Sequence, residues 1–108
     1  MVPMAASPAT REKIHHPPAE ALDLPTIMRA LGDPVRLEIV RLLAERPRVC
    51  GELSTALGIP PSTGSYHLRT LREAGVTRTR ADGTLREISL RRGDLEARFP
   101  GLLDVLTR

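Results

Sequence analysis

Residues 50–75 read CGELSTALGIPPSTGSYHLRTLREAG, and this stretch carries the pattern of two short helices joined by a tight turn. Apolar residues recur at helical spacing on both sides of the turn. Gly58 suits the left-handed conformation that commonly ends a helix, and Pro61 suits the first position of the next helix. We therefore predict one helix over residues 50–57 and a second over residues 61–74.

The second predicted helix has two chemically different faces. Gly64, Leu68 and Leu71 fall on an inner stripe, at the spacing with which a helix packs on its neighbours. A glycine inside a helix costs roughly 1 kcal/mol relative to alanine, so Gly64→Ala is expected to raise the thermal stability. The outer stripe is polar and holds Ser62, Ser65, Tyr66 and Arg69.

A β-hairpin is predicted directly after this helix. Residues 76–81 and 84–90 have the character of two strands and flank Asp82-Gly83, a dipeptide typical of two-residue hairpin turns. A two-residue loop at this dipeptide places Arg78 opposite Glu87. Arg78 would then be a paired structural residue.

Two further helices are predicted upstream. Asp23 is suited to cap a short helix that ends at Gly32, and Asp33 is suited to cap a longer, largely buried helix that Pro47 ends. Residues 1–22 are rich in alanine, proline and polar residues and show no sustained helical period. We expect them to form a flexible N-terminal arm.

The C-terminal segment, residues 93–108, is more apolar than the end of a small domain needs for its own core. We expect it to be a helical dimerisation segment that acts together with the first helix. Because Pro100 would disturb a continuous helix, we expect two short helical pieces or a bend near Phe99. The fold class is then mainly α with a small β-hairpin, and residues 23–92 form the central domain. The apolar side chains of the C-terminal segment are Leu95, Phe99, Leu102, Leu103, Val105 and Leu106.

Composition limits the possible functions. The chain has 108 residues, which suits one hydrophobic core, and only 2% aromatic residues, too few for a platform that stacks single-stranded bases. The single cysteine, Cys50, excludes an internal disulfide. No nucleophile with a base, carboxylate pair or phosphate-binding glycine loop can be assembled, so we predict no enzyme activity. With neither a signal-peptide segment nor a membrane span, we expect a cytoplasmic protein.

Positive charge is concentrated in one third of the chain. The net charge is +3, and fifteen of the sixteen basic residues are arginine. Residues 61–92 hold seven arginines against three acidic residues. Arginine favours bidentate contacts with phosphate and guanine, so this asymmetry fits a protein that binds a polyanion, although an ordinary solvated face would look similar.

Four stretches in a fixed order resemble the arsenical-resistance-repressor (ArsR) family of bacterial transcription factors. They are LGDPVRL at residues 31–37, ELSTALG at 52–58, STGSYHLR at 62–69 and LREAGV at 71–76. The ordered set carries the resemblance, because leucine-rich helical segments are common on their own. It implies a winged helix-turn-helix fold, a homodimer, residues 61–74 as the recognition helix, and repression that an effector relieves.

On this interpretation the outer face of residues 61–74 enters the major groove of double-stranded DNA. Arg69 is the prime candidate for a contact with guanine, and the hairpin arginines would reach flanking phosphates or the minor groove. For His67 we favour a hydrogen bond to a neighbouring helix or a phosphate over direct contact with a base. The candidate set is Ser62, Thr63, Ser65, Tyr66, His67, Arg69, Arg80 and Arg86.

Departures from the family pattern bear on what the protein senses. Metal-sensing members share a CVCDL stretch where this chain has Val49-Cys50-Gly51, so both metal-ligand positions lack cysteine. We interpret Cys50 as a core thiol, and a redox-active sensing thiol or a metal ligand completed by His15 and His16 stays open. Thr84 stands where many members carry a basic residue at the hairpin tip. We predict no metal and no cofactor, and the effector stays open between a hydrophobic small molecule, thiol oxidation and none.

These observations predict a homodimeric, sequence-specific repressor that binds an inverted-repeat operator, with double-stranded DNA and a second copy of the chain as its partners. No membrane partner is expected. The alternative hypothesis keeps the fold and makes it a protein-interaction module without operator specificity, in which the arginines serve solubility. Arg69→Ala separates the two, because only the first hypothesis predicts a loss of specific DNA binding.

Overall fold

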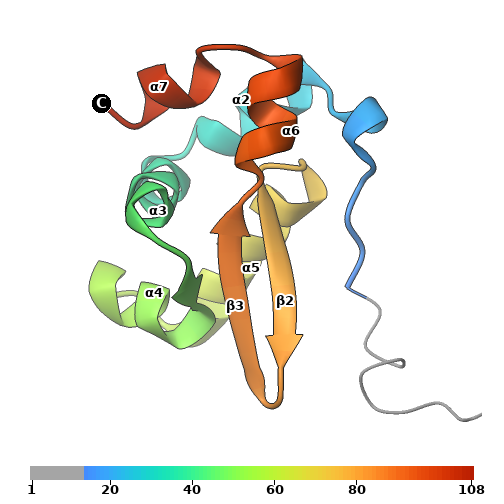
Figure 1. Cartoon of the computed structure of the whole chain (residues 1–108). Coiled ribbons are helices and arrows are strands. Elements are labelled where there is room, and N and C mark those ends of the chain that lie inside the picture. Colours follow the sequence, from blue (N-terminus) through green and yellow to red (C-terminus); the bar gives the residue numbers. More distant parts are fainter. Residues whose placement is uncertain (1–13) are drawn as a thin grey trace, which may run out of the picture.

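The computed structural model of the chain describes residues 14–108, and residues 1–13 of the predicted arm lie outside it. The described part is mainly helical with a small antiparallel sheet, as predicted (Figure 1). None of its helices has the length and apolar character of a membrane span. The elements are η1 (Ala19–Ala21), α2 (Leu24–Leu31), α3 (Pro34–Glu45), β1 (Arg48–Val49), α4 (Cys50–Leu57), α5 (Pro61–Glu73), β2 (Thr77–Asp82), β3 (Leu85–Leu90), α6 (Arg92–Arg98) and α7 (Leu102–Leu106).

Local chemistry sets the helix boundaries where the sequence predicts them. The Asp23 carboxylate caps α2 by accepting a hydrogen bond from the backbone N–H of Thr26 at 3.0 Å. Asp33 caps α3 in the same way and accepts from two backbone N–H groups at 2.7 Å and 3.2 Å. Gly58 ends α4 in the left-handed conformation, with φ of 66°, so the chain turns sharply into α5.

The three strands form an antiparallel sheet in the order β1-β3-β2. β1 has only two residues and pairs with β3 opposite Glu87 and Ile88. Two residues are too few to show the alternation by which a strand is recognised, so the sequence does not predict β1. Its pairing anchors the start of α4 to the hairpin.

The predicted register of the hairpin is wrong by two residues. The loop begins at Gly83, which has a positive φ of 63°. In the described chain only glycines have a positive φ, so Asp82 does not have one. This is the pattern of a type II′ turn with glycine in its first central position, while a type I′ turn at Asp82-Gly83 would need a positive φ at both residues. Arg80 therefore lies opposite Glu87, in place of Arg78.

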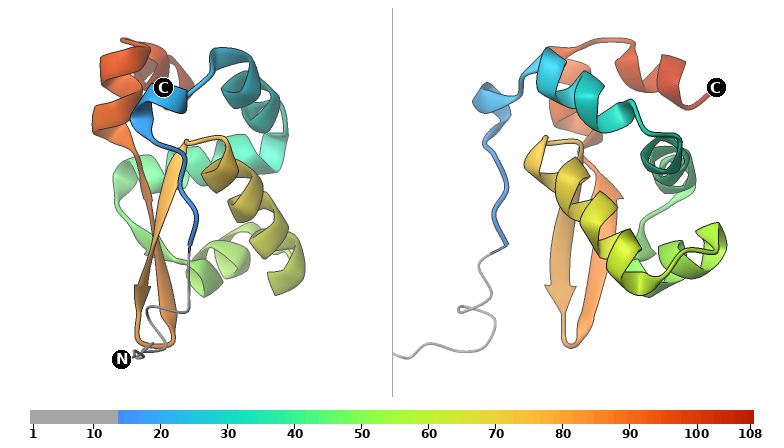
Figure 2. Two further views of the ribbon diagram at one scale, coloured as in Figure 1. Left: turned by 90° about the vertical axis from the view of Figure 1, so that its right-hand side faces the viewer. Right: turned by 180° about the vertical axis from the view of Figure 1, so that it is seen from behind.

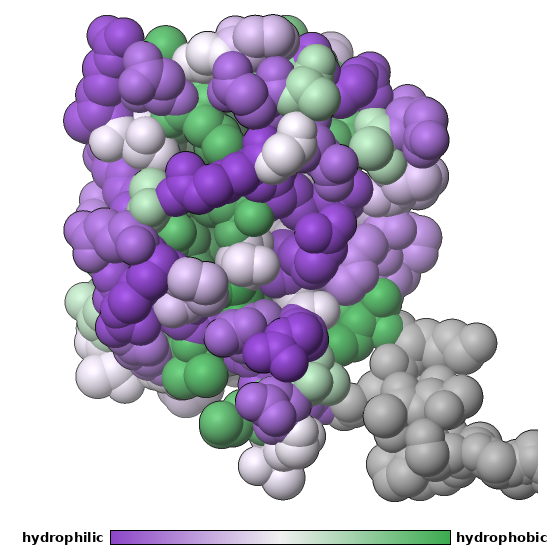
Figure 3. Space-filling view, in the orientation of Figure 1, coloured by the Kyte–Doolittle hydropathy of each residue, from purple (hydrophilic) through white to green (hydrophobic). Residues whose placement is uncertain are grey.

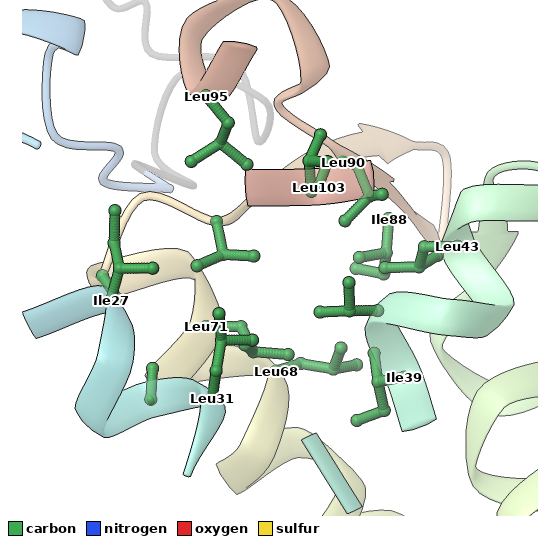
Figure 4. Close-up of a cluster of buried hydrophobic side chains, with 14 of the residues drawn as sticks. Ile27, Leu31, Ile39, Leu43, Leu68, Leu71, Ile88, Leu90, Leu95 and Leu103 are labelled. Atoms are coloured by element: carbon green, nitrogen blue, oxygen red, sulfur yellow. The ribbon is translucent and has the colours of Figure 1, made fainter. Parts of the chain in front are cut away.

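The core is aliphatic and lies between the helices and the sheet (Figure 4). Helix α5 and the inner face of the hairpin both contribute to it, so their relative position is fixed by buried contacts. Burial of one such aliphatic side chain contributes roughly 1.5–3 kcal/mol. The most deeply buried aliphatic residues are Ile27, Ile39, Val40, Leu53, Leu71, Val76, Ile88 and Leu95.

The C-terminal segment is broken into two short helices near Phe99, as predicted. Helices α6 and α7 are separated by residues 99–101, and Gly101 has a φ of 88°. Leu95 and Leu103 point into the core. The segment therefore completes the core of its own chain as well as presenting an outer face.

Residues 14–22 pack on the domain, which differs from the expected free arm. Figure 2 shows this segment running beside the hairpin. The His16 Nε2 atom accepts a hydrogen bond from the backbone N–H of Thr79 at 3.0 Å. Leu22 is buried against Gly75, where a side chain would collide with it. The packed part of the chain therefore begins upstream of the predicted first helix.

Candidate nucleic-acid interface

Helix α5 lies very close to α4 at the start of the helix-turn-helix pair. A Cβ atom at Gly64 would lie 2.3 Å from the Oγ atom of Ser54, far inside contact distance. A steric clash therefore opposes the gain in helix propensity that the sequence predicts for Gly64→Ala. Glycine at this position lets the two helices approach.

The polar stripe of α5 is exposed, as its spacing predicts. Arg69 makes no hydrogen bond or ion pair with any described residue. A guanidinium group that is exposed and unpaired can donate to a base edge or a phosphate without first breaking another contact. The exposed residues of the stripe are Ser62, Ser65, Tyr66 and Arg69, and Thr63 is partly buried beside them.

His67 lies on the inner side of α5 and does not belong to the exposed stripe. Its side chain is only 8% exposed, and its Nδ1 atom accepts a hydrogen bond from Arg36 at 3.0 Å. Arginine can only donate, so Nδ1 of His67 is the acceptor in this contact. Arg36 also donates to the Ala30 carbonyl at 2.5 Å, which ties α5 to α2 and α3. Arg36 and His67 are far apart in sequence, so local spacing gives no signal for this pair.

Arg78 and Arg80 lie on the exposed face of β2, opposite the face that holds the buried Thr77 and Thr79. Figure 3 shows that the face of the molecule seen in Figure 1 is mainly hydrophilic, with hydrophobic surface only in separate patches. Arg80 forms an ion pair with Glu87 at 2.9 Å, and the hydrogen bond to that carboxylate, followed by its charge, raises the pKa of Arg80. Arg78 lies 3.5 Å from Asp94. Arg80, and not Arg78, is therefore the arginine paired with Glu87.

Arg86 lies on the opposite face of the hairpin from Arg80. It pairs across the strands with Ala81, on the side that faces α5, and donates to the carbonyl of Leu85 at 3.0 Å. Arg86 is thus placed between the hairpin tip and α5. Both candidate hairpin arginines have contacts within the chain.

Cys50 is the first residue of α4 and is partly exposed at the edge of the core. Within residues 14–108, no three histidine, cysteine, aspartate or glutamate side chains gather into a group that could hold a metal ion. His16 is engaged with the Thr79 backbone. The thiol itself lines a small cavity between α5 and the hairpin.

Sequence comparisons agree with this geometry. The model of the family described as "Bacterial regulatory protein, arsR family" matches residues 33–78. The chain is 42% identical over 82 residues to the uncharacterized HTH-type transcriptional regulator YceK of Bacillus subtilis, which covers 74% of this chain and 82% of that protein. It is 42% identical over 79 residues to the HTH-type transcriptional repressor SmtB of Mycobacterium tuberculosis, which covers 72% of this chain and 57% of SmtB.

Solved structures share the fold. One is the NMR structure of the homodimeric winged helix-turn-helix DNA-binding domain of a possible ArsR-family regulator from Mycobacterium bovis, with a TM-score of 0.67 and 30% identity over 77% of this chain and 76% of that one. Another is the transcriptional repressor BigR from Xylella fastidiosa, with a TM-score of 0.64 and 32% identity over 77% and 81% of the two chains. The chain therefore belongs to the ArsR family of bacterial regulatory proteins, and it is a DNA-binding transcriptional regulator with a winged helix-turn-helix domain and not an enzyme.

Proposed function

We propose that the protein is a homodimeric repressor that binds an inverted-repeat operator through the outer face of α5. The observation that carries this proposal is the exposed polar stripe of α5, on which Arg69 has no partner among the described residues. The relatives SmtB and BigR are named repressors. A repressor of this kind acts on the bacterial chromosome, so we place it in the cytoplasm.

The dimer interface is proposed at the end of the molecule opposite the hairpin tip (Figure 1). Leu24 of α2 is 42% exposed and Val105 of α7 is 62% exposed. These two residues, with residues 99–102, line a shallow apolar hollow of about 490 Å³. Exposed apolar surface of this kind marks protein contacts, and the M. bovis relative is homodimeric. We assign residues 23–92 to DNA binding and residues 93–108 to dimerisation.

A twofold dimer of this kind presents two α5 helices to one duplex. Two recognition helices related by a twofold axis enter successive major grooves about 34 Å apart. The operator must then contain two half-sites in inverted orientation. Ser62, Thr63, Ser65 and Tyr66 would contact base edges or phosphates, and Arg80 and Arg86 would contact flanking phosphates.

Arg69→Ala tests the role of α5. The substitution removes a bidentate donor for guanine, so specific binding is expected to weaken by about 1–3 kcal/mol, roughly 5- to 150-fold, while folding is unchanged. Fluorescence anisotropy with a duplex selected from a random-sequence library measures this. Arg46→Ala is the matched control, because Arg46 is exposed at the end of α3, lies outside α5, the hairpin and the proposed dimer interface, and contacts Glu52 and the Pro47 carbonyl among the described residues.

The same titrations separate this proposal from a protein-interaction module. If each dimer makes some 6–10 phosphate contacts, the affinity falls by roughly 10³ to 10⁵ between 50 and 200 mM salt. A module that binds no operator would show negligible DNA affinity before and after the substitution. Binding that is insensitive to salt and equal in both variants would reject the repressor.

A further inference from the structure

The end of α2 has a carbonyl group that its own helix cannot satisfy. In a continuing helix the Ala30 carbonyl would accept from the backbone N–H of residue 34, but residue 34 is proline and has no N–H. Arg36 of α3 supplies the missing donor, because its Nε atom donates to the Ala30 carbonyl at 2.5 Å. The Nε–H group of Arg36 is therefore engaged with the end of α2.

The same guanidinium group also contacts α5. Its Nη1 atom lies 3.0 Å from Nδ1 of His67, which is only 8% exposed. Helices α2, α3 and α5 pack on one another at this place (Figure 2). A guanidinium group is planar and its donors have fixed relative directions, so two simultaneous contacts fix α5 relative to the end of α2.

His67 in turn supports a residue of the outer stripe of α5. The rings of His67 and Tyr66 meet edge to face, with their centroids 5.4 Å apart and an angle of 61° between their planes. Tyr66 is 58% exposed and belongs to the residues proposed to contact DNA. The buried ring of His67 therefore limits the positions that the exposed ring of Tyr66 can take. A continuous series of contacts runs from α2 through Arg36 and His67 to Tyr66.

Arg36 acts here through the geometry of its side chain more than through its charge. Its two acceptors are a backbone carbonyl and an imidazole nitrogen, and neither is a carboxylate. The two contacts start from different guanidinium nitrogens. All donors of a lysine radiate from one nitrogen, so Arg36→Lys would keep the positive charge and lose the double contact.

We propose that Arg36 is a positioning residue for DNA recognition, which acts through His67 on the orientation of α5 and on the exposed ring of Tyr66. The DNA part of this inference rests on the proposed function, because it requires that the outer face of α5 reads the operator. α5 is held at two points one helical turn apart, by its close approach to α4 at Gly64 and by Arg36 at His67. The second point links the operator-reading helix to α2, which carries part of the proposed dimer surface.

The positioning of α5 is tested by NMR on the DNA-free full chain. Residual dipolar couplings of the backbone amides give the orientation of α5 relative to α2 and α3. Arg36→Lys is expected to change this orientation. Arg46→Lys is the matched control and is expected to leave it unchanged, because Arg46 is exposed at the end of α3 and contacts Glu52 and the Pro47 carbonyl. An unchanged orientation in folded Arg36→Lys overturns the proposal.

Two substitutions of His67 separate its acceptor from its ring. His67→Asn keeps an acceptor oxygen at the position of Nδ1 and removes the ring, so it is expected to preserve the orientation of α5. His67→Phe keeps a ring and removes the acceptor, so it is expected to change the orientation as Arg36→Lys does. Equal changes in the two variants would assign the effect to packing alone and overturn the role of the Arg36 contact.

The DNA part is tested by the affinity for a selected operator divided by the affinity for a random duplex. A smaller folded fraction lowers both affinities equally and leaves this ratio unchanged. A misplaced α5 weakens base contacts more than sequence-independent phosphate contacts, so the ratio is expected to fall about tenfold or more in Arg36→Lys and to stay constant in Arg46→Lys. An altered orientation of α5 with an unchanged ratio would overturn the role of Arg36 in recognition.

A double-substitution cycle tests the step from His67 to Tyr66. His67→Asn is expected to lower the ratio in the wild-type background and to have no further effect in Tyr66→Ala, because the ring acts through Tyr66. An equal effect in both backgrounds would overturn this step. If the wild-type protein selects no operator, the proposed function fails, while the NMR comparison still decides whether Arg36 positions α5.

Discussion

Gly64 shows how a single missing side chain positions helix α5, the proposed DNA-reading helix. Its absent Cβ leaves room for the buried Ser54 hydroxyl, and the two helices meet there. The Ser54 Oγ atom has no hydrogen-bond partner in the described chain, so it contributes volume without a compensating bond. Packing between α4 and α5 at this point is therefore tight.

We expect Gly64→Ala to lower the melting temperature. Overpacking a tight contact typically costs about 1–3 kcal/mol, which exceeds the roughly 1 kcal/mol that alanine gains over glycine in a helix. Thermal unfolding followed by circular dichroism measures the change.

The double variant Ser54→Ala/Gly64→Ala isolates the cause. It removes the Oγ atom at 2.3 Å and leaves the Ser54 Cβ atom at 3.5 Å, an ordinary contact. We expect its melting temperature to equal or exceed that of the wild type. The clash is not the cause if the double variant is no more stable than Gly64→Ala, or if the single variant is more stable than the wild type.

Helical spacing predicts the direction of most α5 side chains but not their partners. It places Arg69 outward and Leu68 inward, as observed. His67 lies near the boundary between the two stripes, and its burial is decided by Arg36 on another helix. The clash at Gly64 likewise depends on α4, so propensity alone does not determine the effect of its substitution.

At the scale of elements, the segment before α2 covers the edge strand β2. A free strand edge exposes unpaired N–H and C=O groups. Here the backbone N–H of Thr79 donates a hydrogen bond to Nε2 of His16. This nitrogen can accept only when it carries no proton. Burial, followed by the charges of Arg78, Arg72 and Arg91, lowers the pKa of His16 below the ordinary 6.5.

We expect the contact between His16 and β2 to weaken in acid. Because the pKa of His16 in the folded chain lies below 6.5, its imidazole takes up a proton more readily in the unfolded chain. The stabilisation is therefore complete above about pH 6.5 and is lost as the pH falls through the lower folded pKa. The chemical shift of the Thr79 amide, followed by NMR between about pH 5 and pH 8, reports it.

His16→Gln provides the control for this titration. Glutamine keeps an acceptor but has no proton to gain in this range, so the pH dependence at Thr79 should disappear. His15→Gln should leave it in place. A pH dependence that persists in His16→Gln would assign it to another group.

The elements predicted correctly are those whose signals are local. Capping residues and proline give α2, α3 and α5, and Pro100 gives the bend before α7. β1 depends on pairing with β3, and the docking of residues 14–22 depends on β2. The hairpin register depends on which residues carry the positive φ, and the dipeptide Asp82-Gly83 is compatible with two registers.

In the whole molecule, α2 and α7, which carry the exposed apolar residues Leu24 and Val105, lie at the end opposite the hairpin tip (Figure 1). We expect Val105→Glu to weaken the proposed dimer by roughly tenfold or more, because the dimer would bury an unpaired charge. Sedimentation velocity measures this. Leu85→Glu, a comparable change at a 53%-exposed leucine in the hairpin, should leave association unchanged. Equal association of both variants with the wild type would place the interface elsewhere.

The central claim is that two copies present two α5 helices to one duplex. Selection from a random-sequence DNA library, followed by sequencing of the bound fraction, tests this claim most directly. We expect enriched inverted repeats with half-site centres about one helical turn, roughly 10 bp, apart, and a guanine in each half-site whose enrichment disappears in Arg69→Ala. Enrichment of single, unrepeated sites, or of no sequence at all, would contradict it.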